Sequence, residues 1–375
     1  MILEALIFFS MALGFTTVVA LTPHLVAGRF WLSLIPVAAA LAVTAWIAAH
    51  ALNDVIAARD LALTLAAVTV LTRLRMPRWS WVGAQLFASL ALASLAYLVY
   101  AATQTYAVGL SLGVMVASTF LLLLEIVALG LSVSYAFEIV DVLSRRESRL
   151  VRPATQRWPW VALQVATYNE PVEIVHHTLL SLARIDYPHL IVQVVDNNTT
   201  DPALWQPLQV ICEQLGPRFQ FMHLAPWPGF KAGALNEATR RLAPEVEVVG
   251  IIDADYVVEP HFLQATVGHF DDPTVAFVQS SQNYRDWRDS GYLRGLFYSF
   301  RYFFDVTMPC RQHRNAIIFC GTMGLIRRTA LERIGGWSET CVTEDAEASL
   351  RMLGHGYRGV YDRAAYGAGM MPLDF

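Results

Sequence analysis

The chain has 375 residues, of which 55% are hydrophobic and only 15% are charged, and its formal net charge is −4. This composition is too apolar for an ordinary soluble protein, and the charge gives no sign of a nucleic-acid partner. The four cysteines lack the spacing of a metal site or a disulfide framework, which favours a reducing compartment.

Most of the apolar residues precede residue 140, where four segments are each close to the ~20 residues that a membrane-spanning helix needs. We expect these spans at residues 2–22, 31–51, 82–102 and 107–135. The first lacks the basic leading region of a signal peptide and is followed by further apolar segments, so we expect it to be retained. The run from Leu61 to Leu71 is shorter and is interpreted as interfacial, although a fifth span there would invert part of the topology.

Arginines gather in the loop that leads to Trp79 and in the segment after the fourth span, whereas the other two loops hold one arginine between them. The positive-inside rule then predicts a cytoplasmic N-terminus and a cytoplasmic C-terminal domain. Ser134 to Arg149 mixes apolar and charged residues as a helix lying on a membrane surface does. We therefore expect a membrane region over residues 1–136, an interfacial amphipathic linker over 137–155 and a cytoplasmic domain over 156–375.

From Trp160 onward, short apolar runs alternate with segments of helical spacing. Strands are expected at residues 161–166, 190–195, 219–223 and 248–252, and helices at 172–183 and 232–242. This alternation predicts a mostly parallel sheet with right-handed crossovers, in which ligands bind beyond the carboxyl ends of the strands.

Carboxylates follow two of these strands, at the edge where a ligand is expected. Asp196 follows the second strand, and by itself fits a turn residue as well as a binding residue. Asp253 and Asp255 follow the fourth, and in an extended segment they would face one site and repel each other by about 1–4 kcal/mol. A divalent cation removes that repulsion, and oxygen-only ligands favour Mg²⁺ or Mn²⁺, which recruit phosphate oxygens.

Two further motifs carry charge at the start of predicted helices. Lys231 is either a solvated surface charge or a compact positive charge beside a nucleotide diphosphate. Glu344, Asp345 and Glu347 suit the positive end of a helix dipole, and the functional interpretation makes one of them a general base for an attacking hydroxyl. No P-loop motif is present, which argues against a P-loop nucleotide enzyme.

Six stretches carry a resemblance to a known family when they are taken together and in order. They are Ala166-Thr167-Tyr168-Asn169-Glu170, Asp196, Lys231-Ala232-Gly233-Ala234-Leu235-Asn236, Asp253-Ala254-Asp255, Phe319-Cys320-Gly321-Thr322 and Thr343-Glu344-Asp345. This set resembles the processive family-2 glycosyltransferases, the membrane enzymes related to cellulose, chitin and hyaluronan synthases. The resemblance covers about residues 80–375, and two softer matches, at 278–287 and 314–318, point to the bacterial β-glucan synthases.

The resemblance implies a fold and a place in the cell. The fold is α/β, a GT-A type nucleotide-sugar-binding domain with a mostly parallel sheet, preceded by an α-helical transmembrane region. The location implied by the resemblance is the inner (plasma) membrane, with a chain that crosses the lipid bilayer several times and a catalytic domain in the cytoplasm.

The resemblance also implies a role for each matching residue. The donor implied is a UDP-sugar, whose uracil and ribose would be held by Thr167, Tyr168 and Glu170. Asp196 and Asp253 would bind the uridine and its diphosphate, and Lys231 would lie beside the nucleotide. Asp253 and Asp255 would bind the metal ion, Mg²⁺ or Mn²⁺. Asp345 would deprotonate the acceptor hydroxyl, which then displaces UDP with inversion. The acceptor site would be lined by Cys320, Gly321, Thr322 and Glu344, with Tyr284 and Trp337 either stacking on sugar or packing in the core.

The sequence ends at Phe375 without the Gln-x-x-Arg-Trp segment and the later membrane helices of the family. We expect either a fragment, a chain completed by a second polypeptide, or a protein without activity. The leading hypothesis is transfer of a sugar, with glucose favoured, from a UDP-sugar to a growing β-glucan, the polysaccharide acceptor. The alternatives are the same site with UDP-N-acetylglucosamine or UDP-glucuronate, and a non-catalytic nucleotide-binding partner of a complete synthase.

Overall fold

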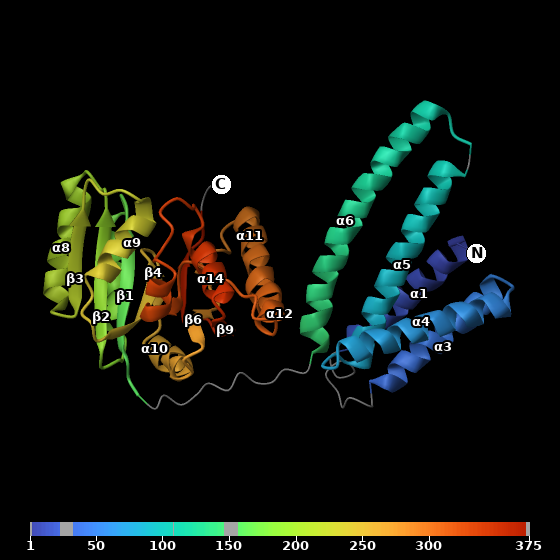
Figure 1. The fold of residues 1–375 in the computed structure, drawn as a ribbon, viewed down its shortest axis with the longest axis horizontal. Coiled ribbons are helices and arrows are strands. Elements are labelled where there is room, and N and C mark those ends of the chain that lie inside the picture. The colour runs from blue at the N-terminus through green and yellow to red at the C-terminus, as the bar shows by residue number, and fades with distance from the viewer. Residues whose placement is uncertain (1, 23–32, 108, 146–156, 373–375) are drawn as a thin grey trace. The chain divides into compact units, whose positions relative to one another are not determined.

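The computed structural model describes residues 2–22, 33–107, 109–145 and 157–372. The chain divides into two compact units, Met1–Ser148 and Arg149–Phe375, each with its own core (Figure 1).

The first unit consists of long apolar helices (Figure 1). They are α1 (Ile2–Ala20), α3 (Leu34–Ala51), α4 (Val55–Arg75), α5 (Trp81–Tyr106) and α6 (Leu112–Ser144). Within the described residues, all five are long and apolar enough to cross a membrane. Much of the apolar surface of α6 is exposed, as expected for a helix that faces lipid or other helices.

Helix α4 differs from the interpretation of Leu61 to Leu71 as a short interfacial run. Asp54 caps the helix by accepting hydrogen bonds from the backbone N–H groups of Ile56 and Ala57, at 3.0 and 2.9 Å. The helix therefore begins well before the apolar run, and its 21 residues match the length of a membrane span. The count of four spans and the cytoplasmic N-terminus stay predictions, and a fifth span would reverse the side of the N-terminus.

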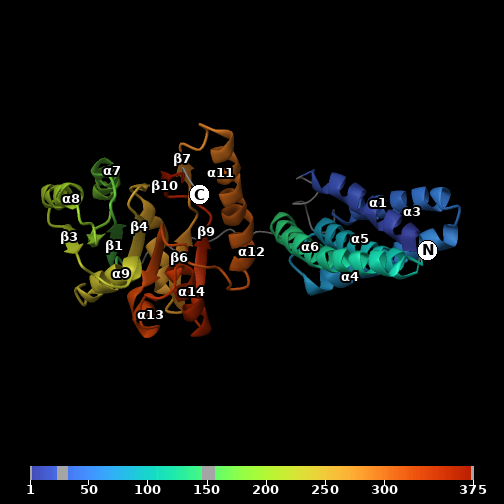
Figure 2. The ribbon, with the colours of Figure 1, turned by 90° about the horizontal axis from the view of Figure 1, so that it is seen from above.

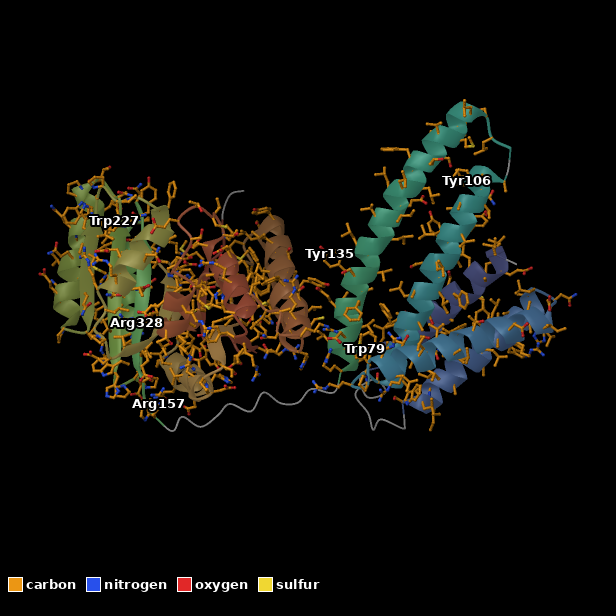
Figure 3. The ribbon with its side chains drawn as sticks, viewed as in Figure 1. Trp79, Tyr106, Tyr135, Arg157, Trp227 and Arg328 are labelled. Carbon is orange, nitrogen blue, oxygen red and sulfur yellow. The ribbon has the colours of Figure 1, made fainter. Side chains whose placement is uncertain are left out.

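The end of α6 also differs from the sequence-based expectation. Residues 137–144, predicted to begin a separate interfacial linker, continue α6 without a break, and 146–156 lie outside the described residues. Trp79, which is labelled in Figure 3, precedes α5. The buried carboxylate of Asp141 accepts a hydrogen bond from Trp79 Nε1 at 2.6 Å and pairs with Arg145. These contacts fix the last turns of α6 against the segment that precedes α5.

The second unit is built on a seven-stranded sheet with the order β3-β2-β1-β4-β8-β6-β9. Its strands are β1 (Trp160–Thr167), β2 (Leu190–Asn197), β3 (Phe219–Leu224), β4 (Val246–Asp253), β6 (Val275–Ser280), β8 (Gly324–Arg327) and β9 (Arg358–Asp362). Strand β8 is antiparallel to both neighbours and the other pairs are parallel, so the predicted mostly parallel sheet is confirmed. A small sheet of β5 (Val257–Val258), β10 (Gly367–Met370) and β7 (Tyr284–Arg285) lies outside it.

Helices cover both faces of the large sheet (Figure 2). They are α7 (Val172–Ala183), α8 (Pro202–Leu215), α9 (Phe230–Arg240), α10 (Phe262–Thr266), α11 (Gly291–Tyr302), α12 (Met308–Gln312), α13 (Arg328–Arg333) and α14 (Glu344–Gly354), with the single turns Val267–Asp271 and Phe303–Thr307. Successive residues of β1 pack in different hydrophobic clusters, one for each face of the sheet. Leu163 packs in the cluster that contains residues of α7, and Ala162 packs in the cluster that contains residues of α9. This two-faced burial explains why the strand reads as a continuous apolar run.

The register of the central strands brings their carboxyl ends together. Thr167 at the end of β1 is paired with Asp196 of β2, and its neighbour Ala166 is paired with Asp253 of β4. Residues that are 29 and 87 positions apart in sequence, counted from Thr167 to Asp196 and from Ala166 to Asp253, therefore meet at one edge of the sheet.

Candidate active site

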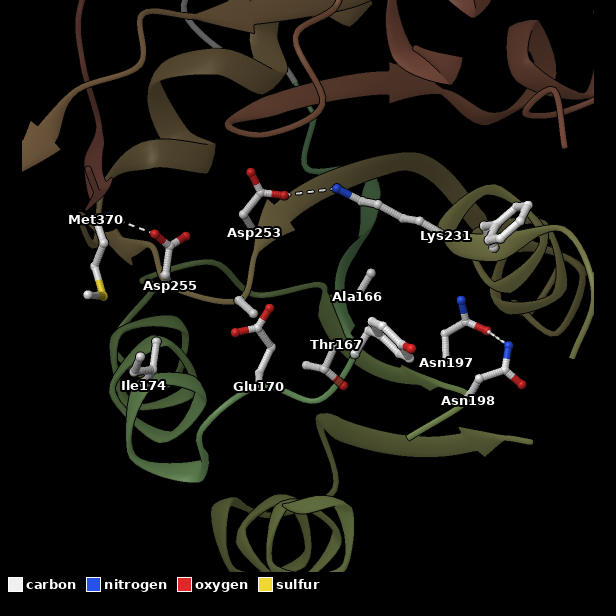
Figure 4. Close-up of a pocket in the computed structure, with 13 residues that line it drawn as sticks. Ala166, Thr167, Glu170, Ile174, Asn197, Asn198, Lys231, Asp253, Asp255 and Met370 are labelled. Carbon is white, nitrogen blue, oxygen red and sulfur yellow. Dashed lines mark hydrogen bonds and ion pairs between the residues drawn. The ribbon is translucent and has the colours of Figure 1, made fainter. Parts of the chain in front are cut away.

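A pocket of about 750 Å³ opens at this edge (Figure 4). Its lining includes residues at or just after the end of β1 (Thr167, Tyr168, Glu170), of β2 (Asn197, Asn198) and of β4 (Asp253, Asp255), together with the start of α9 (Phe230, Lys231) and Met370 of β10. Six of the seven predicted donor-site residues lie in this lining, and Asp196 does not.

The two aspartates after β4 share the pocket, although not for the reason that the sequence suggested. The strand ends at Asp253 and Asp255 lies in a turn, so the alternation of an extended segment does not apply. Asp253 Oδ1 accepts a hydrogen bond from Lys231 Nζ at 2.9 Å, and Asp255 Oδ2 accepts one from the backbone N–H of Met370 at 2.7 Å (Figure 4). One oxygen of each carboxylate is thereby fixed, from two different sides of the pocket.

The carboxylates of the pocket repel one another. Burial raises the pKa of Asp255, the Met370 N–H opposes that rise, and the charge of Asp253 adds to it. Burial likewise raises the pKa of Glu170, with Asp255 and Asp253 adding to the shift. The site is thus an acidic pocket in which the pKa values of Asp255 and Glu170 are raised.

Lys231 is the cation of this cluster. Burial lowers its pKa, but the ion pair and hydrogen bond with Asp253, together with the charges of Glu344 and Asp345, outweigh that effect and raise it. The lysine therefore stays charged and links the donor-site carboxylates to those at the start of α14.

The donor atoms of the site fit a divalent cation that arrives with phosphates. Among the described residues, no group of three His, Cys, Asp or Glu side chains could hold a metal ion. Mg²⁺ needs fewer protein ligands when substrate phosphates complete its shell, and one or two carboxylates then suffice. Asp253 and Asp255 supply that number, and their repulsion is what a cation would relieve.

Asp196 lies beneath the pocket wall, with an exposure of only 1%. Its Oδ1 accepts hydrogen bonds from Thr167 and Thr199 at 3.1 and 2.6 Å, and its Oδ2 accepts one from His223 Nδ1 at 2.7 Å. Thr199 in turn accepts the backbone N–H of Asn169 at 2.9 Å. In this structure Asp196 holds the segment between β1 and α7 in place, and its direct contact with uridine stays a prediction.

The loop of residues 319–322 connects the donor pocket to α14. Thr322 Oγ1 accepts the backbone N–H of Asp253 at 2.9 Å, which fixes the end of β4. Gly321 has a φ of +74°, and a Cβ atom added there would lie 2.7 Å from Asp345 Oδ2. Burial, followed by the charge of Asp345, raises the pKa of the Cys320 thiol. Gly321 and Cys320 of this loop therefore lie close to the predicted base, Asp345, whereas Thr322 contacts Asp253.

Glu344 lies beside Asp345 at the first turn of α14. Burial raises the pKa of Glu344, and the charge of Lys231 opposes that rise. Both acids are thus within electrostatic reach of Lys231, as roles at the reacting groups would require.

The two predicted sugar-stacking residues differ in their surroundings. Trp337 is 3% exposed and packs against Phe319 in the core. The prediction that it stacks on a sugar is therefore wrong, and the alternative that it packs in the core is correct. Tyr284 is half-buried, stacks on Phe300 and donates a hydrogen bond to Gln282, and its role stays a prediction.

Seven residues of the lining were not predicted as site residues, and besides Ala166, Ile174 and Ala254 they are Asn197, Asn198, Phe230 and Met370. Asn197 and Asn198 follow Asp196 directly, and their polar run was a usable signal. Phe230 was also readable, as an aromatic residue that immediately precedes the motif lysine. Met370 gave no signal, because the strand that brings it to Asp255 comes from 115 positions away.

The family model described as glycosyltransferase like family 2 matches residues 159–366, which include all seven strands of the large sheet and the pocket lining except Met370. The chain belongs to this family. The prediction of a family-2 glycosyltransferase is therefore confirmed, and so is the mixed α/β fold class of GT-A type.

The chain is similar in sequence to several named glycan synthases and glycosyltransferases. The chain is 29% identical over 284 residues to the cellulose synthase catalytic subunit (UDP-forming) of Xanthomonas axonopodis pv. citri, covering 73% of this chain and 37% of that one. It is 30% identical over 286 residues to cellulose synthase 1 of Komagataeibacter xylinus, covering 74% and 18%. It is 30% identical over 228 residues to probable glucomannan 4-beta-mannosyltransferase 1 of Arabidopsis thaliana, covering 56% and 39%. The chain thus spans less than two fifths of each of these relatives.

Among solved structures, the mannosyltransferase of Pyrobaculum calidifontis in complex with GDP-Man and Mn²⁺ has a TM-score of 0.49 and 23% identity to this chain. The similarity covers 77% of this chain and 70% of that one.

Proposed function

We propose that this family-2 glycosyltransferase transfers glucose from UDP-glucose to a growing β-glucan, with inversion, at the cytoplasmic face of the inner membrane. The observation that carries the proposal is the meeting of Asp253, Asp255 and Lys231 in one pocket at the carboxyl edge of the sheet. Two of the relatives support the choice of sugar, since both are cellulose synthases and one of them is described as UDP-forming.

In the proposed donor site, the uracil and ribose lie against Tyr168, Thr167 and Glu170, and the diphosphate lies toward Lys231. A divalent cation, Mg²⁺ or Mn²⁺, supplies positive charge at the departing diphosphate when it is bound by Asp253 and Asp255. Lys231 adds a further positive charge on the same side. Asp196 contributes by holding Thr167 and the turn that follows β1.

In the proposed transfer step, the Asp345 carboxylate takes the proton of an acceptor hydroxyl. The hydroxyl oxygen then attacks the anomeric carbon, and the bond from that carbon to the diphosphate oxygen breaks on the opposite face, so the configuration inverts. Glu344 and the loop of Cys320, Gly321 and Thr322 line the acceptor side in this proposal, which is supported by the position of Gly321 and Glu344 next to Asp345. The negative charge that develops on UDP is what the positive groups of the donor site stabilise.

Two alternatives share this pocket. The first keeps the chemistry and changes the sugar to N-acetylglucosamine or glucuronate. The second is a nucleotide-binding partner of a complete synthase, in which a second polypeptide supplies the remaining acceptor groups.

The full chain, purified in detergent, is to be incubated with Mn²⁺ and radiolabelled UDP-glucose, UDP-N-acetylglucosamine or UDP-glucuronate. Asp345→Asn serves as the matched control, because it keeps the size of the side chain and removes the base. We expect label from UDP-glucose to enter a polymer that a β-glucanase digests, and the variant to make none. Incorporation of label from one of the other two UDP-sugars would identify that sugar as the donor in place of glucose. UDP binding without transfer of any sugar would favour the role of a nucleotide-binding partner. A chain that binds no UDP would contradict the proposal.

A further inference from the structure

Phe230 combines two costly features at the donor pocket. Its side chain lines the pocket yet is 81% exposed, and its backbone has a φ of +53°. A bulky residue with positive φ is a genuine outlier, and such outliers persist where the surrounding structure imposes them, commonly at ligand sites. Neither packing in the core nor helix propensity explains an exposed phenylalanine at the first position of α9.

The loop before Phe230 is held firmly. The Asn198 side chain accepts the backbone N–H of Trp227 at 2.7 Å and donates to its carbonyl at 2.8 Å. Gly229 follows with a φ of +80°, and a Cβ atom there would lie 2.5 Å from Glu339 Oε2. These contacts hold the backbone just before Phe230, whose side chain lines the pocket.

A second aromatic side chain lines the same pocket. Tyr168, which follows β1, is 60% exposed. The charged groups Lys231, Asp253 and Asp255 line the pocket with them, and Lys231 is the direct neighbour of Phe230. The pocket therefore offers apolar ring faces next to a charged end, which matches a flat base joined to a diphosphate.

We infer that Phe230 stacks on the nucleobase of the donor and, with Tyr168, determines how tightly the nucleoside end is held. The inference rests on the proposed function, because it requires a nucleoside diphosphate in this pocket. Base–aromatic stacking depends on the π-face that every base has, and a single aromatic side chain contributes about 1–3 kcal/mol, which is roughly 5- to 150-fold in affinity. Phe230 thus supplies affinity that Asp253, Asp255 and Lys231 cannot, since those three groups address the phosphates.

The test measures UDP affinity by calorimetry with Mn²⁺ on the full chain in detergent. The variants are Phe230→Ala, Phe230→Gly and Phe230→Trp. Glycine relieves the positive φ, so that variant remains folded while it lacks the ring. We expect the alanine and glycine variants to lose about 5- to 150-fold in affinity, and the tryptophan variant to keep the wild-type affinity.

Each other outcome is decisive. Wild-type affinity in Phe230→Ala would overturn the inference and leave the proposed function standing. An equal loss in the alanine and tryptophan variants would also overturn it, because a stacking role requires rescue by another aromatic ring. A wild-type chain that binds no UDP would instead overturn the proposed function, and this inference with it.

Discussion

Replacing Asp255 with asparagine is expected to stabilise the metal-free protein while abolishing metal-dependent nucleotide binding. The amide keeps an oxygen that can accept the Met370 N–H, which now lies 2.7 Å from Oδ2, and it removes the charge that Asp253 and Glu170 repel. Like unit charges ~4 Å apart repel by about 1 kcal/mol in water and about 4 kcal/mol near a protein surface. Because the Met370 N–H already offsets part of this repulsion, we expect a gain of about 1 kcal/mol, or roughly 2–4 °C in melting temperature.

The assay is thermal unfolding of the detergent-solubilised chain, followed by tryptophan fluorescence, in chelator and in Mn²⁺ with UDP. Ligands at 100 times their dissociation constant stabilise the wild type by about 2.7 kcal/mol, and the variant should gain nothing. The order of melting temperatures should therefore reverse between the two conditions. Asp289→Asn, at an exposed carboxylate outside the pocket, is the matched control and should behave as the wild type. A variant that melts lower than wild type in chelator, or that gains equally from the ligands, would refute the reasoning.

The same substitution should change the pH dependence of stability. The folded protein holds protons on Asp255 and Glu170 above their ordinary pKa values of 3.8 and 4.5, where the unfolded chain has already released them. The folded state then binds more protons, so metal-free stability falls as the pH rises from the ordinary values through the raised ones. Urea unfolding across this acid range should show a shallower fall in Asp255→Asn, and identical pH profiles would contradict the raised pKa of Asp255.

Three further predictions concern single side chains around the site. Asp345→Asn should leave the calorimetric affinity for UDP within about twofold of wild type while transfer is lost, and a large loss of affinity would place Asp345 in the donor site instead. Thr322→Val removes the acceptor of the buried Asp253 N–H and should cost about 1–3 kcal/mol in urea unfolding, whereas Thr322→Ser should restore most of it. His223→Leu removes a hydrogen-bond donor to the buried Asp196 and should weaken UDP binding. His223→Asn, whose side-chain amide matches the Nδ1 position, should keep the wild-type affinity for UDP. Equal UDP affinity in both variants would show that this hydrogen bond does not shape the pocket.

The first half of the second unit could be predicted from sequence because its signals are local. The apolar runs of β1, β2, β3 and β4 lie close together in sequence, so their alternation with helices predicted a mostly parallel sheet, although not the order β3-β2-β1-β4 in which these strands lie. The far side of the sheet was not predicted. Strand β8 has only four residues and runs antiparallel between β4 and β6, which are themselves separated in sequence, and no local pattern encodes such an insertion.

The site was predicted in its residues more than in its geometry. The Asp253-Ala254-Asp255 motif identified the two carboxylates, but not the turn that places Asp255 or the distant Met370 that binds it. Asp196 was predicted as a binding residue, but its carboxylate is buried and accepts three hydrogen bonds from the protein. An acidic residue after a strand gives the same sequence pattern in both situations, so the sequence could not distinguish them. Burial and tertiary partners depend on the whole fold, and a single sequence does not contain them in local form.

The central claim is that the carboxylates after β4 bind a nucleoside diphosphate through a divalent cation. Calorimetric titration of the full chain with UDP, first in Mn²⁺ and then in excess chelator, tests this claim most directly. The account predicts saturable binding in Mn²⁺ and a loss of most of that affinity in chelator. UDP binding of equal strength in both solutions, or binding in neither, would contradict it.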